Sequence, residues 1–285
     1  MRRAAVRRWG IRAATGAGAV VMLALVYVAA SSEWLLRRRH DAPLERLPPI
    51  ASPDPAEGER LAVIVGCWAG CHGLRGEGEV LEGGGAFRVT APTLSSVLPD
   101  YTDEELVRLI RYGVKRDGHT AIGMVPRTFY PLSNHDLALI ISHLRRAPAL
   151  PALPRERRVT LLGRTALATG LWHTSADEVD RSRPRWGELP RRTPFERGRY
   201  LASITCSECH GVDFKGNELE GGPSLVVVAR YDIEQFEHLL RTGEPIDGRD
   251  LGIMSWVARN AFSRFTDDEV RDVHVFLRTS FGLAP

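Results

Sequence analysis

The chain has 285 residues, of which 44% are hydrophobic and 26% are charged, and this composition excludes wholesale disorder, a collagen-like repeat and a polytopic membrane protein. At roughly 100 to 200 residues per domain, the length predicts two domains. The net charge of +3 hides an asymmetry, because residues 1–40 carry +7 and 151–197 carry +4, whereas 41–150 and 198–285 carry −3 and −5. The two parts expected to fold are mildly acidic, which argues against nucleic-acid binding.

An uncharged apolar segment, residues 13–32, is long enough for one membrane-spanning helix. Five arginines precede it and three follow it, which favours a cytoplasmic N-terminus and places the rest of the chain on the periplasmic side of a bacterial inner membrane. We expect residues 1–40 to form a signal anchor with Trp34 at the interface. The alternative is a signal peptide cleaved near Val28-Ala29-Ala30, which would leave a periplasmic protein.

The remainder of the chain contains an internal repeat. Gly58-Glu59-Arg60-Leu61-Ala62 matches Gly198-Arg199-Tyr200-Leu201-Ala202, Ala91-Pro92-Thr93-Leu94 matches Gly222-Pro223-Ser224-Leu225, residues 101–106 match 231–236, and residues 132–145 match 265–278. The spacing within each copy is similar as well. The repeat predicts two similar domains, residues 47–150 and 194–285, joined by a basic, proline-containing linker, residues 151–193.

Each copy shows helical periodicity. Apolar residues stand at i, i+3 and i+4 in both, at Leu106, Leu109 and Ile110 and at Phe236, Leu239 and Leu240. Ser133 with Asp136, and Thr266 with Glu269, predict capping boxes before the last helix of each copy. Neither copy shows convincing alternation, so we expect an all-α fold with little or no sheet. The linker is expected to hold a short helix over 159–171 and either hangs free or wraps the domains.

Four cysteines in an exported protein raise the question of two disulfides. Their positions indicate chemistry instead, because Cys67 and Cys71, and Cys206 and Cys209, are each followed at once by a histidine. In a C-x-x-C-H motif the two thiols add to the vinyl groups of a haem, and the histidine lies under the iron. Zinc is the alternative, but a structural zinc site needs four ligands where each cluster offers three.

With Cys206-Ser207-Glu208-Cys209-His210 and the repeat, residues 55–147 and 194–280 resemble the class I cytochrome c family, and more closely the membrane-anchored diheme cytochromes. The resemblance implies two tandem class I cytochrome c domains and two covalently bound haem c groups. The first motif departs from the family, since three residues separate Cys67 from Cys71. Gly70 is small enough to be looped out, and attachment through one thiol or both stays open.

The resemblance also implies ligands, residue by residue. The proximal iron ligands would be His72 and His210, the distal ligands Met124 and Met254, and the carbonyls accepting the histidine ring N–H would be those of Pro92 and Pro223. The two methionines are the only ones after position 22, and each comes eleven residues after a glycine, Gly113 or Gly243. This favours ligation over gap-filling in a core. His119 is an alternative ligand in the first domain.

Filled axial positions imply one-electron transfer instead of catalysis on a substrate. The partners expected from the resemblance are a donor dehydrogenase or quinol-oxidising complex and an acceptor cytochrome or oxidase. One alternative is a diheme enzyme, such as a peroxidase or a thiosulfate dehydrogenase, which would need an open or labile iron position. Another is a cytochrome subunit of a larger dehydrogenase or respiratory complex.

Overall fold

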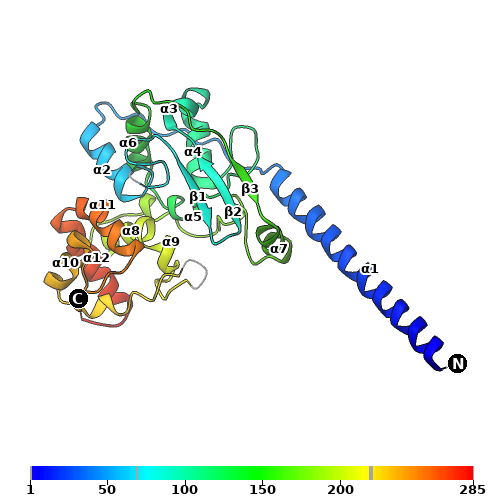
Figure 1. Cartoon of the computed structure of the whole chain (residues 1–285). Helices are drawn as coiled ribbons and strands as arrows, with labels where there is room; N and C mark the ends of the chain where they lie inside the picture. Colours follow the sequence, from blue (N-terminus) through cyan, green and yellow to red (C-terminus); the bar gives the residue numbers. More distant parts are fainter. Residues whose placement is uncertain (1, 69, 218–220, 285) are drawn as a thin grey trace.

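In the computed structural model, a long N-terminal helix projects from a body in which the two repeats lie against each other (Figure 1). The structure describes residues 2–68, 70–217 and 221–284. As predicted, the fold is mostly helical. The helices are α1 (Arg2–Arg37), α2 (Pro55–Ile64), α3 (Leu94–Val97), α4 (Asp103–Tyr112), α5 (Pro126–Phe129), α6 (Asn134–Leu144), α7 (Leu161–Thr169), α8 (Pro194–Thr205), α9 (Ser207–His210), α10 (Ile233–Thr242), α11 (Ile253–Asn260) and α12 (Asp267–Ser280). The strands are β1 (Glu79–Gly83), β2 (Phe87–Ala91) and β3 (Arg157–Val159), and short 3-10 helices cover Leu98–Asp100, Trp186–Glu188, Val228–Arg230 and Phe262–Arg264.

In both repeats the first helix packs on the last, α2 on α6 and α8 on α12. A glycine at the same repeat position lies at each crossing. A Cβ on Gly198 would lie 1.9 Å from the carbonyl oxygen of Asp272, and one on Gly58 would lie 2.7 Å from that of Leu139. The absence of a side chain therefore lets the helices touch backbone to backbone.

Replacing Gly198 with alanine is expected to lower the free energy of unfolding by about 1–3 kcal/mol, because the new methyl group overpacks a backbone contact. Gly58→Ala is the matched comparison, with a smaller loss expected because its crossing is wider. Thermal unfolding followed by circular dichroism measures both variants. Equal losses in the two would contradict the ordering that these distances predict.

The first repeat contains one small sheet, in keeping with the little sheet expected, although no alternation in the sequence marks its strands. Strands β1 and β2 form an antiparallel hairpin, and β3 pairs with the other edge of β2. The hairpin is an insertion, since Pro92 comes 20 positions after His72 whereas Pro223 comes 13 positions after His210. The repeat comparison passes over these residues. The run Gly83-Gly84-Gly85 between two short stretches of β-prone residues is the signal that could have revealed it.

The segment expected as a linker packs along the first domain. It supplies β3 and then α7, which confirms the predicted helix. Further on, Arg185 donates to Glu45 at 2.6 Å, and the Gly187 amide donates to the carbonyl of Pro131 at 2.9 Å. The segment therefore wraps along the first repeat and does not hang free, which is one of the two arrangements expected for it.

The predicted capping box is complete in the second domain and half formed in the first. Thr266 and Glu269 bond reciprocally at the start of α12. Ser133 accepts from the Asp136 amide at 2.9 Å, as predicted. The Asp136 carboxylate, however, accepts from the Tyr200 hydroxyl of the other repeat, so the expected return bond to Ser133 is wrong.

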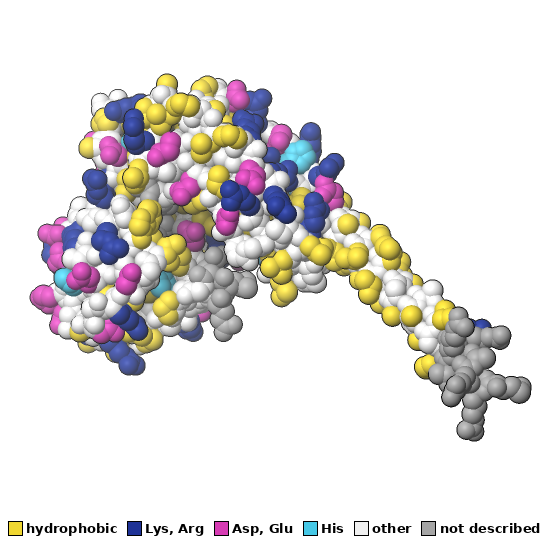
Figure 2. Space-filling model, in the orientation of Figure 1, with side chains coloured by type: hydrophobic (Ala, Val, Ile, Leu, Met, Phe, Trp, Pro, Cys, Tyr) yellow, Lys and Arg dark blue, Asp and Glu magenta, His cyan; other side chains and the backbone are white. Residues whose placement is uncertain are grey.

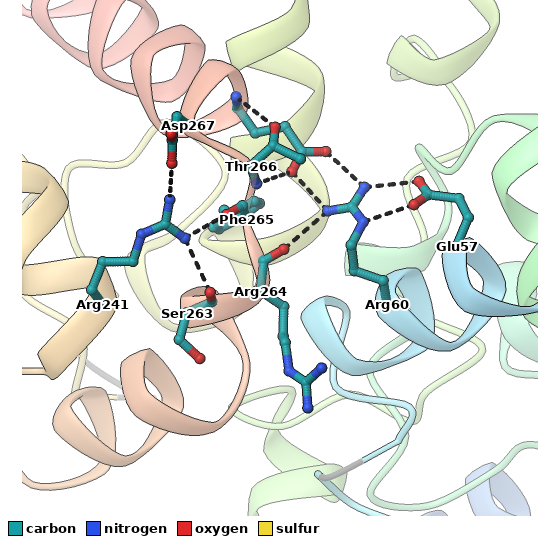
Figure 3. Close-up of polar contacts among 9 residues, drawn as sticks. Glu57, Arg60, Arg241, Ser263, Arg264, Phe265, Thr266 and Asp267 are labelled. Atoms are coloured by element: carbon teal, nitrogen blue, oxygen red, sulfur yellow. Dashed lines mark hydrogen bonds and ion pairs between the residues drawn. The ribbon is translucent and has the colours of Figure 1, made fainter.

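The two repeats contact each other reciprocally. Arg60 of α2 donates to Glu269 of α12 at 2.7 and 3.0 Å, while Tyr200 of α8 donates to Asp136 of α6. Arg60 and Tyr200 hold equivalent repeat positions, and so do Glu269 and Asp136. Figure 3 shows Arg60 bound by Glu57 on its own helix and reaching the Arg264 carbonyl of the other repeat. Such exchange of equivalent contacts is the pattern of a two-fold symmetric interface.

Candidate functional site

The two histidines of the Cys/His motifs make the same hydrogen bond. His72 Nδ1 lies 2.9 Å from the carbonyl oxygen of Pro92, and His210 Nδ1 lies 2.7 Å from that of Pro223. Since a carbonyl only accepts, Nδ1 carries the proton and Nε2 is the ring nitrogen available to a metal. Burial lowers the pKa of both histidines, against the opposing effect of the carbonyl bonds. Both rings are therefore neutral near pH 7, which is the form that binds iron.

The loop after each histidine is built alike in the two repeats. The histidine is followed by a glycine with positive φ, Gly73 (74°) or Gly211 (76°). The carbonyl of His72 accepts from the Gly78 amide at 2.9 Å, and that of His210 accepts from the Gly216 amide at 3.0 Å. The same backbone geometry therefore forms in each repeat, and it places the proline carbonyl within hydrogen-bond distance of the histidine ring.

The second motif is helical. Cys206 caps the C-terminus of α8, and α9 carries Cys209 and His210 on the following turn. Cys206 packs against the hydrophobic core, and the His210 side chain is buried. A helical turn places Cys206 and Cys209 on neighbouring positions of one face, which suits two thioether bonds to one flat group.

The first motif has a different backbone. Its extra residue replaces the helical turn of α9 by turns, in which the Cys71 amide donates to the Gly66 carbonyl at 3.3 Å. A Cβ on residue 70 would lie 2.3 Å from that carbonyl oxygen, so any residue larger than glycine would force the turn to shift. The tight turn around Gly70 agrees with the expectation that the extra residue is looped out, while Ala69 lies outside the described residues.

The four cysteines all lie in the described part of the chain, and no disulfide joins them. Burial raises the pKa of Cys67 to about 12 and those of Cys71 and Cys206 to about 11, so these thiols are protonated near pH 7. Within residues 2–68, 70–217 and 221–284, no group of three or more His, Cys, Asp and Glu side chains is placed to hold a metal ion.

The two predicted distal ligands lie in different local settings. Met124 is in the loop before α5, and its carbonyl accepts from the Ser175 hydroxyl at 2.7 Å. Met254 is the second residue of α11, so the two methionines do not share one local backbone structure. Both side chains are partly buried against the core. Ser175 was not predicted, because it is 51 residues from Met124 and nothing in the local pattern marks it.

His119, the alternative ligand in the first domain, lies at the surface. Its Nδ1 is 3.4 Å from a carboxylate oxygen of Asp117, and its backbone forms a bridge with Arg39. Its immediate partners thus come from a surface turn and from the end of α1.

The two Cys/His motifs are close to each other. Helix α5, which follows Met124, contacts α9, and Arg127 of α5 donates to the carbonyl of Glu208 at 3.3 Å. Glu208 lies between the cysteines of the second motif. Burial is the main cause of the raised pKa values of Cys67 and Cys71 in the first motif, and the negative charge of Glu208 raises both further.

No protein-family model matches the chain. Among curated proteins it is similar to the fructose dehydrogenase cytochrome subunit of Gluconobacter japonicus, with 21% identity over 270 residues. The match covers 83% of this chain and 55% of that protein, so the chain spans about half the length of its relative. The chain is thus distantly related to a cytochrome subunit, which supports the expected haem chemistry in outline.

Proposed function

We propose that the chain is a membrane-anchored c-type cytochrome with two covalent haems, which passes single electrons from a membrane or periplasmic donor to a downstream cytochrome or oxidase. The observation that carries this is the histidine-to-proline-carbonyl hydrogen bond, formed in both repeats directly after a pair of cysteines. Orienting a ligand histidine through its second nitrogen fixes its tautomer and makes it a stronger ligand.

The residues fit the group they would hold. Neutral His72 and His210 present Nε2, and Met124 and Met254 offer thioether sulfurs from partly buried positions. Haem supplies the one-electron chemistry when bound, and a His/Met pair raises its potential relative to two histidines. The chain's own contribution is to orient the ligands, exclude water from them and hold the two motifs close together.

The proposed organisation has an anchor over residues 1–40, cytochrome domains over 47–150 and 194–285, and the wrapped segment 151–193 between them. Helix α1 is the one described helix that is long and apolar enough to cross a membrane, over Trp9–Arg37. It continues unbroken past Val28-Ala29-Ala30, and Ser32 and Leu36 beyond that point are buried against the body of the protein. This packing supports retention of the segment as an anchor.

The likeness to a dehydrogenase cytochrome subunit favours a membrane-bound dehydrogenase as the electron donor. The proposed chain would then be the cytochrome subunit of a larger complex, which is compatible with electron transfer through both haems. Gentle solubilisation of native membranes, followed by affinity purification of the full-length chain, is expected to retain dehydrogenase activity with an artificial electron acceptor. Purification of the chain without any such activity would contradict this donor.

The first test is the intact mass of the full chain produced in a host that matures c-type cytochromes. We expect the polypeptide plus two haems, stable to acid and organic solvent because the bonds are covalent. Cys206→Ala with Cys209→Ala is expected to lower the count to one. A single haem on the wild-type chain would overturn the two-haem proposal, and no haem would overturn the cytochrome proposal.

Carbon monoxide binding distinguishes the proposed electron-transfer cytochrome from the diheme-enzyme alternative. With both axial positions occupied by His and Met, we expect the reduced protein to show no carbon monoxide spectrum until it is denatured. Carbon monoxide binding to the native reduced protein would show an open or labile position and would favour an enzyme.

A further inference from the structure

Helix α7 carries an apolar surface that the described residues leave uncovered. Leu161 and Leu162 on its first turn are each 61% exposed, and Leu171, just beyond its end, is 68% exposed. Hydrophobic side chains gather where the body meets α1, which is where Figure 1 places α7 (Figure 2). Neither the haem motifs nor the contact between the repeats uses this surface.

This helix packs alongside the C-terminal part of α1. Arg164 donates to Ser32 and Glu33 of α1 at 3.0 and 2.9 Å, and the Tyr27 hydroxyl lies 3.4 Å from the carbonyl oxygen of Ala168. The two helices therefore run antiparallel. The six residues from Glu33 back to Tyr27 correspond to about 9 Å along α1 at a rise of about 1.5 Å per residue.

The other side of α7 is held by the β1–β2 hairpin. The Thr160 amide donates to the Ala86 carbonyl at 2.9 Å, and the Thr160 hydroxyl donates to that of Gly85 at 2.7 Å. A Cβ on Gly163 would lie 2.2 Å from the Ala86 carbonyl oxygen, so α7 lies directly on the hairpin turn. Its orientation relative to α1 is thus built into the fold, including the inserted hairpin.

Positive charge flanks the apolar surface. Arg155, Arg157 and Arg158 lie three to six residues before the start of α7 and are exposed, while Glu156 among them pairs with Arg88. Arg157 also donates to the Leu36 carbonyl at the end of α1 at 3.4 Å. Basic side chains beside an apolar face are the arrangement that binds anionic lipid headgroups, with the apolar face at the acyl boundary.

We propose that α7 is a second membrane contact, with Leu161, Leu162 and Leu171 inserted into the lipid interface beside the anchor and Arg155 and Arg158 on anionic headgroups. The proposal rests on α1 spanning the membrane. The contacts of α7 with α1 extend from Glu33 to Tyr27, so the end of α7 that precedes Leu171 lies nearer the middle of the span than its first turn does. A second contact would fix the first cytochrome domain relative to the bilayer, where one helix alone would let it swivel.

The experiment uses spin labels on the full-length, haem-loaded chain in vesicles of mixed phosphatidylcholine and phosphatidylglycerol. Labels are placed by Leu162→Cys in α7, by Val21→Cys in the anchor, and by Ile246→Cys as a control in the second domain. Ile246 is 60% exposed, matching Leu162. Power saturation compares access by oxygen, which concentrates in lipid, with access by a water-soluble nickel chelate.

We expect the oxygen-to-nickel ratio at position 162 to exceed that at position 246 several-fold and to lie below that at position 21, because Val21 is near the middle of the span and α7 contacts α1 near its edge. Lipid access at 21 with water access at 162 would overturn the α7 contact and leave the anchor standing. Water access at both would overturn the anchor, and the α7 contact with it. Exclusion of both reagents at 162 would show that protein covers the surface, which also overturns the proposal.

Discussion

Met254→Ala is expected to lower the reduction potential of the second haem, on the order of 0.1–0.3 V, because loss of the thioether ligand removes the preference for ferrous iron and axial ligands set haem potentials over about 0.8 V. The absorbance band that arises from methionine sulfur on ferric iron should fall by half, with the share of the first haem remaining. A redox titration followed by absorbance measures both effects on one sample.

Two matched variants sharpen this result. Met124→Ala makes the same change at the first haem and should remove the other half of the band. Met22→Ala makes it on the anchor, where the side chain is 62% exposed, and should leave both potentials unchanged. An unaltered spectrum in Met254→Ala would reject Met254 as a ligand while leaving the covalent attachment of haem untouched.

Glu45→Gln is expected to lower the free energy of unfolding by about 3–5 kcal/mol, because it leaves a buried charge without its counter-ion. The Arg111 guanidinium is fully buried and lies 2.6 Å from Glu45, while its other end donates to the Leu132 carbonyl at 2.8 Å. Tyr112 and Arg185 donate to the same carboxylate. Denaturant unfolding at pH 7 measures the loss.

The control for this variant is Glu82→Gln, which removes a carboxylate from the exposed pair with Arg88 in the same domain. Exposed pairs contribute little, so unfolding should shift only slightly. The equivalent arginine of the second repeat, Arg241, donates to the Phe265 carbonyl and pairs with Asp267 (Figure 3). The first contact matches that of Arg111 with the Leu132 carbonyl, but the charge partners of Arg241 are Asp267 and Glu237. A loss no larger than that of Glu82→Gln would refute the role given to Glu45.

The same carboxylate predicts a pH dependence. Burial acts to raise the pKa of Glu45, but hydrogen bonds from Tyr112 and Arg185 and the charge of Arg111 outweigh it, so the pKa lies below its usual value of 4.5. Its stabilisation is thus fully present above the unfolded pKa and is lost as pH falls through the lower folded pKa. Between pH 6 and pH 3, Glu45→Gln should flatten the decline in stability seen in the wild-type chain.

The features that the sequence predicted well are local. The Cys/His motifs lie within six residues or fewer, and the helix-starting caps at Thr266 and Ser133 join groups three residues apart. The hydrogen bonds from the histidines to the carbonyls of Pro92 and Pro223 were implied by the resemblance to the class I cytochrome c family, and the repeat gave both copies the matching proline. Motifs and repeats predict geometry between residues that are close in sequence. That geometry does not depend on where the segment lies in the fold.

The sequence by itself thus determined the mostly helical repeat, the two Cys/His motifs and an apolar helix near the N-terminus. Only the tertiary structure decided what lies between these parts. The return bond of Asp136 goes to Tyr200, 64 residues away, and Arg60 finds Glu269 across 209 residues. Ser175 fastens the methionine loop, and α7 lies along α1. Such partners are chosen by packing between distant segments, because shape and charge complementarity arise only once those segments have folded.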